Sequence, residues 1–398
     1  MKKLRLPTFA TALALLTFST ACFGDTFTHR QRGEVVHGYA VGQAEGVEIV
    51  VHTEEKGVVR LNLAEWEVTA DRLGRNNKVI ILTIDNEMMF EIETEALEQA
   101  LGAVSKEGPL FILFEIDTPG GRTDLVQRIC GAIADAGGCE VVAFVNGGPY
   151  GGAISAGAAA ALACDKIYMA NGTSIGAATV ISLSEKGPTD IKKTFGEAVG
   201  EKFSSAWQAY LASLAEHNRR PGLLARAMID KDLEVIEVSE ADRKLFIEPV
   251  NRRPEQRVVH TWSKKGSLLT LTADEAIKCG IGDGIVNSRG ELLRELDAAG
   301  AEVVINDDVQ KAREELRRAQ GQLNRIRKSI DLKIKQSGHR QPRAKVLKIL
   351  RSARAEFKTL IKLAKKYPDL GLNIQVLEDE LNTVEANYQE VKMGSRRR

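Results

Sequence analysis

The chain has 398 residues, more than one compact core ordinarily accommodates, so two or three structural units are expected. Hydrophobic residues make up 43% and charged residues 27% of the sequence, which excludes a wholly disordered chain. The net charge is only +1, but residues 306–398 hold 23 Lys and Arg against 12 Asp and Glu, so this segment carries +11 and the rest −10. Such a basic segment faces either an acidic partner or solvent. The five cysteines are too few and too scattered for a disulfide scaffold, and no C-x-x-C pair indicates a zinc site.

The first 24 residues are typical of a signal peptide. A positively charged start is followed by an apolar stretch over 6–18, too short for a comfortable membrane span, and then by small residues up to Ala21. Cys22 follows directly, so lipidation of that cysteine, and with it a membrane tether, remains an alternative behind plain cleavage. We therefore expect an exported protein, periplasmic or secreted, whose mature chain does not span a membrane.

Residues 25–72 predict a small β-rich module, such as a barrel. Short β runs at 34–39, 47–51 and 58–63 are separated by turns that contain Gly and Glu. Three histidines fall here, but no cysteine or paired aspartate converges on them, so we interpret them as surface or strand residues: His29, His37 and His52. Residues 71–77 are charged, end in Gly-Arg-Asn-Asn and predict a linker.

Residues 78–299 alternate between apolar strands and segments of helix length, which predicts layered α/β structure. Strands are expected at 79–84, 110–116, 141–146 and 166–169, and helices at 91–104 and 123–136. The segment 230–263, rich in Glu, Arg and Val, is interpreted as a lid or an elaborated edge. Many open α/β sheets bind ligands at the turns that follow their strands.

Residues 306–393 change to helix-forming composition. Apolar residues recur at three-four spacing in three runs, interrupted at 338–342 and 367–368. This predicts a helical hairpin or a coiled coil. The lysines and arginines of this segment suggest binding to nucleic acid or anionic lipid. A solvated face on an assembly helix is the preferred interpretation, because the chain is expected to be exported and aromatic residues to stack bases are absent.

Two glycine turns carry the candidate chemistry. Gly120 and Gly121 follow a buried strand and precede a helix start, where bare N–H groups can form an oxyanion hole. In the second turn, Ser155 is the one hydroxyl among glycines and alanines, and the N–H of Ala156 could join the oxyanion donors. From spacing alone, a Ser155 that simply caps the following helix is slightly favoured.

A nucleophilic serine needs a base, and histidine is scarce. The sequence from 54 to 216 contains none, and His217 falls in a polar stretch typical of a solvated helix end, so a Ser-His-Asp triad is hard to assemble. A lysine whose burial leaves a neutral amine can replace histidine. Three lysines precede or open the predicted helix that contains Phe203: Lys192, Lys193 and Lys202. Lys202 directly precedes Phe203 and the apolar stripe of this helix, which could desolvate it, although an exposed lysine is the commoner case.

Four segments in order carry a family resemblance: 116–121, 153–157, 169–178 and 269–284. Together they cover about 78–290, and this part of the chain resembles the NfeD-type serine proteases of the Clp-protease class. The resemblance implies the Clp-protease/crotonase fold of stacked ββα units and a Ser-Lys dyad. The matching positions are Ser155 as nucleophile, Lys202 as base, and the N–H groups of Gly120, Gly121 and Ala156 as oxyanion donors.

The sequence also departs from that family. Its members usually continue into membrane helices and a small β domain, whereas this chain has the helical segment instead. Ile154 stands where a small residue is usual beside the serine, which affects substrate fit, and Asn171 where Pro is frequent. The resemblance implies a peptide or protein substrate and a homo-oligomer, with 309–391 as an added interface.

The resulting hypothesis is an exported serine endopeptidase that forms an acyl-enzyme and needs no metal or other cofactor. Two alternatives stay open. One is a non-catalytic scaffold that recruits partners through its coiled coil. The other is crotonase-like acyl-CoA chemistry, which export and the matching Ser and Lys disfavour.

Overall fold

A computed structural model describes residues 25–40, 48–53, 56–68, 78–136, 139–184, 187–241, 243–298, 301–337 and 341–394. The predicted signal peptide with Cys22 and the predicted linker at 71–77 lie outside these residues. Contacts divide the chain into two compact units, residues 1–77 and residues 78–398.

The first unit contains an antiparallel sheet in the order β4-β3-β2-β1-β5. Its strands are β1 (Asp25–His29), β2 (Val35–Ala40), β3 (Glu48–Thr53), β4 (Gly57–Asn62) and β5 (Trp66–Val68). Among the described residues the order is that of an open sheet rather than a barrel. His29 is structural: its ring packs edge-on against Trp66, and its Nδ1 accepts the N–H groups of Gln31 and Arg32.

The second unit is built on a parallel sheet in the order β18-β10-β8-β7-β6-β19. Its strands are β6 (Lys78–Ile84), β7 (Phe111–Ile116), β8 (Val141–Val145), β10 (Lys166–Met169), β18 (Gly284–Ile285) and β19 (Glu302–Ile305). Every residue of β7 and β8 is buried, because helices and loops cover both faces, and this explains why their sequences are apolar apart from Glu115, which pairs with Arg289. The sheet extends past the expected boundary at 299, since β19 pairs with β6.

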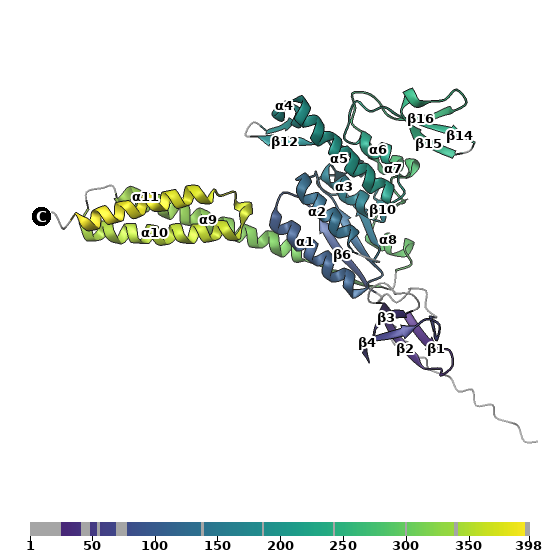
Figure 1. The fold of residues 1–398 in the computed structure, drawn as a ribbon, viewed down its shortest axis with the longest axis horizontal. Coiled ribbons are helices and arrows are strands. Elements are labelled where there is room, and N and C mark those ends of the chain that lie inside the picture. Colours follow the sequence, from purple (N-terminus) through teal and green to yellow (C-terminus); the bar gives the residue numbers. More distant parts are fainter. Residues whose placement is uncertain are drawn as a thin grey trace, which may run out of the picture. The chain divides into compact units, whose positions relative to one another are not determined.

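Helices and smaller sheets surround this sheet. The helices are α1 (Glu91–Val104), α2 (Thr123–Ala134), α3 (Ala156–Ala163), α4 (Ile191–Phe195), α5 (Glu197–His217), α6 (Gly222–Ala227), α7 (Ala273–Cys279) and α8 (Arg289–Glu295), with 3-10 turns η1 (Ser105–Glu107) and η2 (Pro249–Asn251). A second sheet, in the order β17-β11-β9, joins β9 (Gly152–Ile154), β11 (Ser174–Gly176) and β17 (Thr270–Thr272). The segment expected as a lid or edge forms a separate antiparallel sheet next to α6 (Figure 1), made of β14 (Val235–Glu240), β15 (Arg243–Ile247) and β16 (Arg257–Ser263). A hairpin of β12 (Ile181–Ser184) and β13 (Gly187–Asp190) precedes α4.

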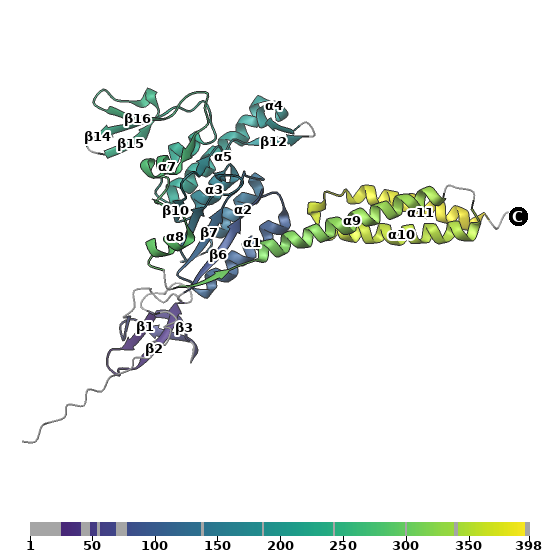
Figure 2. The same cartoon turned by 180° about the vertical axis from the view of Figure 1, so that it is seen from behind.

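The C-terminal helical segment consists of α9 (Asp308–Ser337), α10 (Arg343–Lys366) and α11 (Ile374–Met393), with the 3-10 turn η3 (Pro368–Leu370) before α11. We call these elements the C-terminal bundle. The three helices lie side by side in both views (Figures 1 and 2) and share one apolar core around Leu350 and Phe357. None of the described helices is both long and apolar enough to cross a membrane.

Candidate active site

Ser155 lies on a sharp turn between β9 and α3, in a backbone conformation that serine rarely adopts. Its φ is 56° and its ψ is −116°. Such conformations cost about 1–3 kcal/mol and cluster at functional sites. The Ser155 N–H donates to the carbonyl of Gly176 at 2.8 Å, which fixes the turn. Ser155 thus occupies the N-cap position of α3, but its hydroxyl makes no capping bond and the side chain is only half-buried. The capping function that spacing favoured is absent.

The two glycine turns lie directly against each other. Gly120 has φ +123°, and a Cβ atom placed on it would be 2.7 Å from the Cβ and 3.0 Å from the Oγ of Ser155. The backbone of Thr118 joins the turns, since its N–H donates to Gly152 (2.8 Å) and its carbonyl accepts from Ile154 (3.1 Å). Only glycine leaves enough space at position 120 for the serine side chain.

The expected oxyanion donors differ in their availability. The N–H of Ala156 is the first of α3 and therefore has no partner within the helix, and it lies at the positive end of the helix dipole. Among the described residues no acceptor binds the N–H of Gly121. The N–H of Gly120, in contrast, donates to the Thr118 hydroxyl at 3.1 Å. In this conformation the donors that remain are Ala156 and Gly121.

Asp117 is a positioning residue that sequence reasoning did not single out. Its carboxylate is 6% exposed and accepts the N–H groups of Tyr150 (3.2 Å) and Gly152 (3.0 Å). One buried side chain at the end of β7 therefore holds the turn that leads into Ser155. A charged residue directly after a buried, largely apolar strand was the available signal, because a buried carboxylate needs hydrogen-bond donors.

His217 cannot serve Ser155 in this fold. The neighbouring Asn218 donates its side-chain amide to the carbonyls of Leu162 (2.9 Å) and Ala163 (3.2 Å), the last residues of α3. Ser155 precedes the first residue of the same helix. At 1.5 Å per residue the eight residues of α3 separate the two ends by about 12 Å. A catalytic pair of Ser155 with His217 is therefore excluded.

The three candidate lysines have different environments. The Lys192 ammonium lies 2.6 Å from Glu201 and 3.5 Å from Glu197. The hydrogen bond that Lys192 donates to the Glu201 carboxylate raises the pKa of Lys192, so that this lysine stays charged and is a poor base. Lys193 is exposed on α4. Lys202 is exposed on the first part of α5, and in the part of the chain described no hydrogen bond or ion pair joins it to Ser155.

The expected apolar stripe of α5 is divided between two surroundings. Trp207 is buried, and its indole N–H donates to the carbonyl of Ala178 at 3.0 Å, which attaches α5 to the segment after β11. Phe203, next to Lys202, is 53% exposed, and its ring lies 6.3 Å from that of Phe195, which is 55% exposed. Within a single chain these aromatic rings do not desolvate Lys202.

The described cysteines do not compete with Ser155 as nucleophiles. All four are buried: Cys130, Cys139, Cys164 and Cys279. Burial raises the pKa of Cys130 and of Cys279 to about 12. Because the thiolate is the reactive form, these thiols are inert at neutral pH.

The second unit is similar to known proteins. Residues 78–252 match the family model of the NfeD1b N-terminal domain. The resemblance to NfeD-type proteins is confirmed. The chain is 30% identical to Membrane protein NfeD1b of Bacillus subtilis (strain 168) over 192 residues, which are 48% of this chain and 35% of that protein. It is 28% identical to Membrane-bound protease PH1510 of Pyrococcus horikoshii over 196 residues, 49% of this chain and 34% of that protein. The matched part thus spans about a third of the length of these curated relatives.

Two solved structures are also similar. One is a serine-to-alanine mutant of the 1510-N membrane-bound stomatin-specific protease, with a TM-score of 0.42, 23% identity, and coverage of 58% of this chain and 97% of that chain. The other is a lysine-to-alanine mutant of the same protease in complex with a substrate peptide, with a TM-score of 0.42, 24% identity, and coverage of 58% and 92%.

Proposed function

We propose that this chain is a serine endopeptidase in which Ser155 is the nucleophile and Lys202 the general base. The observation that carries the proposal is the strained, half-buried Ser155 packed against the Gly120 turn, with the first N–H of α3 beside it. A hydroxyl next to backbone donors at a helix start suits a reaction that develops an oxyanion. The similarity of this part of the chain to Membrane-bound protease PH1510 supports the same activity.

The proposed reaction proceeds through an acyl-enzyme. An extended peptide adds as a strand beside the two glycine-rich turns, next to Ser155. The Oγ of Ser155 attacks the scissile carbonyl carbon while the neutral Nζ of Lys202 takes the hydroxyl proton. The N–H groups of Ala156 and Gly121 hold the oxyanion, and Gly120 joins them if it releases Thr118. Lys202 then gives this proton to the leaving amine as the C–N bond breaks. A water molecule gives a proton to Lys202 and attacks the ester carbon, and Lys202 returns that proton to the Oγ of Ser155 as the C–O bond breaks.

This reaction requires Lys202 to be brought to Ser155 and shielded from water. The exposed rings of Phe195 and Phe203 form an apolar surface next to it. We propose that a bound peptide, or a second copy of the chain in a homo-oligomer, covers this surface and favours the neutral amine. We further propose that the protein acts after export, as the apolar stretch at 6–18 indicates, with Cys22 as an optional lipid anchor.

The second candidate is a protease-like scaffold without catalytic activity. The exposure of Lys202 and the absence of a contact with Ser155 among the described residues favour it. In that case the C-terminal bundle recruits a partner and the α/β unit serves assembly.

Cleavage of a peptide library, read by mass spectrometry across a range of pH, separates the two candidates. Ser155→Ala and Lys202→Ala are expected to abolish all cuts made by the wild type. Lys202→Arg is expected to do the same, because a guanidinium keeps its proton. Lys193→Ala is the matched control, since it removes an exposed lysine from the neighbouring helix. Wild-type cleavage should increase with pH as the base loses its proton. Profiles without cuts at every pH would support the scaffold, and cuts that survive Ser155→Ala would refute the assignment.

A further inference from the structure

The backbone of the Gly120–Gly121 turn depends on a neighbouring loop. Residues 85–90, which join β6 to α1, form what we call the support loop. The N–H of Met88 donates to the carbonyl of Gly120 at 2.9 Å, and the carbonyl of Met88 accepts the N–H of Arg122, also at 2.9 Å. The Thr118 hydroxyl donates to the carbonyl of Asn86 at 2.7 Å. The conformation of the oxyanion turn is therefore set by where the support loop lies.

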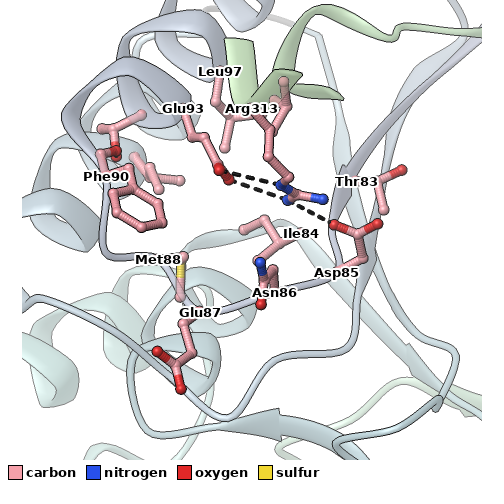
Figure 3. Close-up of a pocket in the computed structure, with 13 residues that line it drawn as sticks. Thr83, Ile84, Asp85, Asn86, Glu87, Met88, Phe90, Glu93, Leu97 and Arg313 are labelled. Atoms are coloured by element: carbon pink, nitrogen blue, oxygen red, sulfur yellow. Dashed lines mark hydrogen bonds and ion pairs between the residues drawn. The ribbon is translucent and has the colours of Figure 1, made fainter. Parts of the chain in front are cut away.

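Helix α9 of the C-terminal bundle holds the support loop at its start. The guanidinium of Arg313 binds both carboxylate oxygens of Glu93 on α1, each at 3.1 Å, and one oxygen of Asp85 at 2.9 Å (Figure 3). The side chains of Arg313 and Glu93 are 21% and 11% exposed, so this pairing is largely shielded from solvent. Bidentate pairing fixes orientation as well as distance. One side chain of the bundle thus joins the first residue of the support loop to α1.

The bundle also holds the end of the support loop. Phe90, the N-cap residue of α1, provides no side-chain cap. The carboxylate of Asp369 in η3 takes this function, accepting the N–H of Glu91 at 2.7 Å and that of Ile92 at 2.9 Å, although it lies 278 residues after Glu91. The Glu91 carboxylate in turn lies 3.1 Å from the guanidinium of Arg122, which directly follows the turn. Both ends of the support loop are therefore attached to the bundle.

We propose that Arg313 and Asp369 are positioning residues for the oxyanion turn, through which the C-terminal bundle keeps Gly120 and Gly121 in place. The catalytic consequence rests on the proposed protease function. A bundle in its observed place holds the support loop, the loop holds the turn, and the turn presents its N–H groups beside Ser155. Displacing the bundle releases both attachments together, so a partner that binds it would control the site from a distance.

Hydrogen exchange and kinetics of the full chain test this inference. Arg313→Ala and Asp369→Ala are expected to increase amide exchange in peptides covering 85–92 and 118–122, and to lower kcat by about 10- to 100-fold at nearly constant KM, because a misplaced oxyanion donor weakens the transition state alone. Asp369→Asn should restore both, since asparagine also caps helices. Arg318→Ala is the control, because Arg318 lies on the same helix, 80% exposed, in an ion pair with Glu314.

The outcomes separate this inference from the proposed function. Unchanged exchange in both segments overturns the inference, even with an active wild type. Increased exchange with unchanged kcat in an active enzyme overturns it as well, because the turn then needs no such support. Increased exchange in the variants, together with a wild type that cleaves nothing, supports the positioning and refutes the protease assignment instead. Melting curves of each variant identify loss of the whole fold. If the alanine variants unfold, exchange and kcat are measured instead in the conservative variants. Asp369→Asn should resemble the wild type and Arg313→Lys, which loses the bidentate pairing, should not; equal behaviour of the two overturns the inference.

Discussion

Replacing Gly120 with alanine tests the central geometry of the site. The new Cβ atom would lie 2.7 Å from the Cβ of Ser155, whereas carbon atoms attract each other best at about 3.5–4.0 Å. The backbone φ of +123° is a second source of strain, since left-handed conformations cost a non-glycine residue about 1–2 kcal/mol. Overpacking typically adds about 1–3 kcal/mol. We therefore expect Gly120→Ala to destabilise the protein by about 2–5 kcal/mol or to displace the turn from Ser155.

Two measurements on the same sample follow this change. Thermal unfolding should show a decrease in Tm of at least about 4 °C, by the usual relation between stability and Tm for domains of this size. The rate at which a fluorophosphonate labels Ser155 should decrease at least about tenfold, since the oxyanion donors shift. Gly131→Ala on α2 is the matched control: a Cβ there meets nothing within 4 Å, and the helix should gain about 0.5–1 kcal/mol. A Gly120→Ala variant with wild-type Tm and labelling would refute the packing of the two turns.

Four further predictions test other parts of the molecule. His217→Gln should leave cleavage unchanged, because α3 separates this residue from Ser155; a strong loss would restore histidine as a candidate base. Iodoacetamide applied to the native protein at neutral pH should leave cleavage unchanged and the four buried cysteines unmodified in peptide mass spectra, because burial raises the pKa of Cys130 to about 12. Phe357→Ala should destabilise the bundle by about 3–5 kcal/mol in urea unfolding, as the ring is 3% exposed; a change below about 1 kcal/mol would argue against the bundle core. The hydrogen bond from the backbone N–H of Thr272 lowers the pKa of Glu275 in the α7 capping box. The stability that the Glu275 carboxylate contributes is therefore present above its unfolded pKa and is lost as pH falls through its folded pKa. In melting experiments, Glu275→Gln should reduce the loss of Tm at acid pH, and the pH dependence of Tm near neutral pH should stay unchanged.

Local patterns were sufficient to predict much of the α/β unit. The expected helix at 91–104 and strand at 166–169 coincide with α1 and β10, because a one-sided apolar spacing and a short apolar run between turns are signals within each segment. Strand β19 was not predicted. It lies exposed at the sheet edge, and its one glutamate and three β-branched residues neither alternate nor form an apolar run of four, so the sequence does not identify a strand. Its pairing with β6 is a contact between residues more than two hundred positions apart, which leaves no mark on a local pattern.

The same distinction applies to the candidate site. Gly120, Gly121, Ser155 and Ala156 were predicted from two separate turns, and the fold brings these turns together because both follow strands of neighbouring sheets. The partners that fix them could not be predicted in the same way. A single aspartate in a short turn, such as Asp369, has no sequence feature that relates it to the start of a helix 278 residues earlier.

The strain at Ser155 persists because several bonds fix the turn independently. The Ser155 N–H donates to Gly176. Thr118 bonds the preceding strand through both its N–H and its carbonyl, and the N–H of Gly152 also donates to the buried carboxylate of Asp117. Hydrogen bonds of this kind contribute about 0.5–1.5 kcal/mol each, and those to a charged group about 1.5–3 kcal/mol, so together they offset a conformation that costs about 1–3 kcal/mol. Each of these bonds would also form with alanine at position 155, because none uses the hydroxyl. The turn is therefore built by its surroundings and not by the serine, which leaves the hydroxyl free to react.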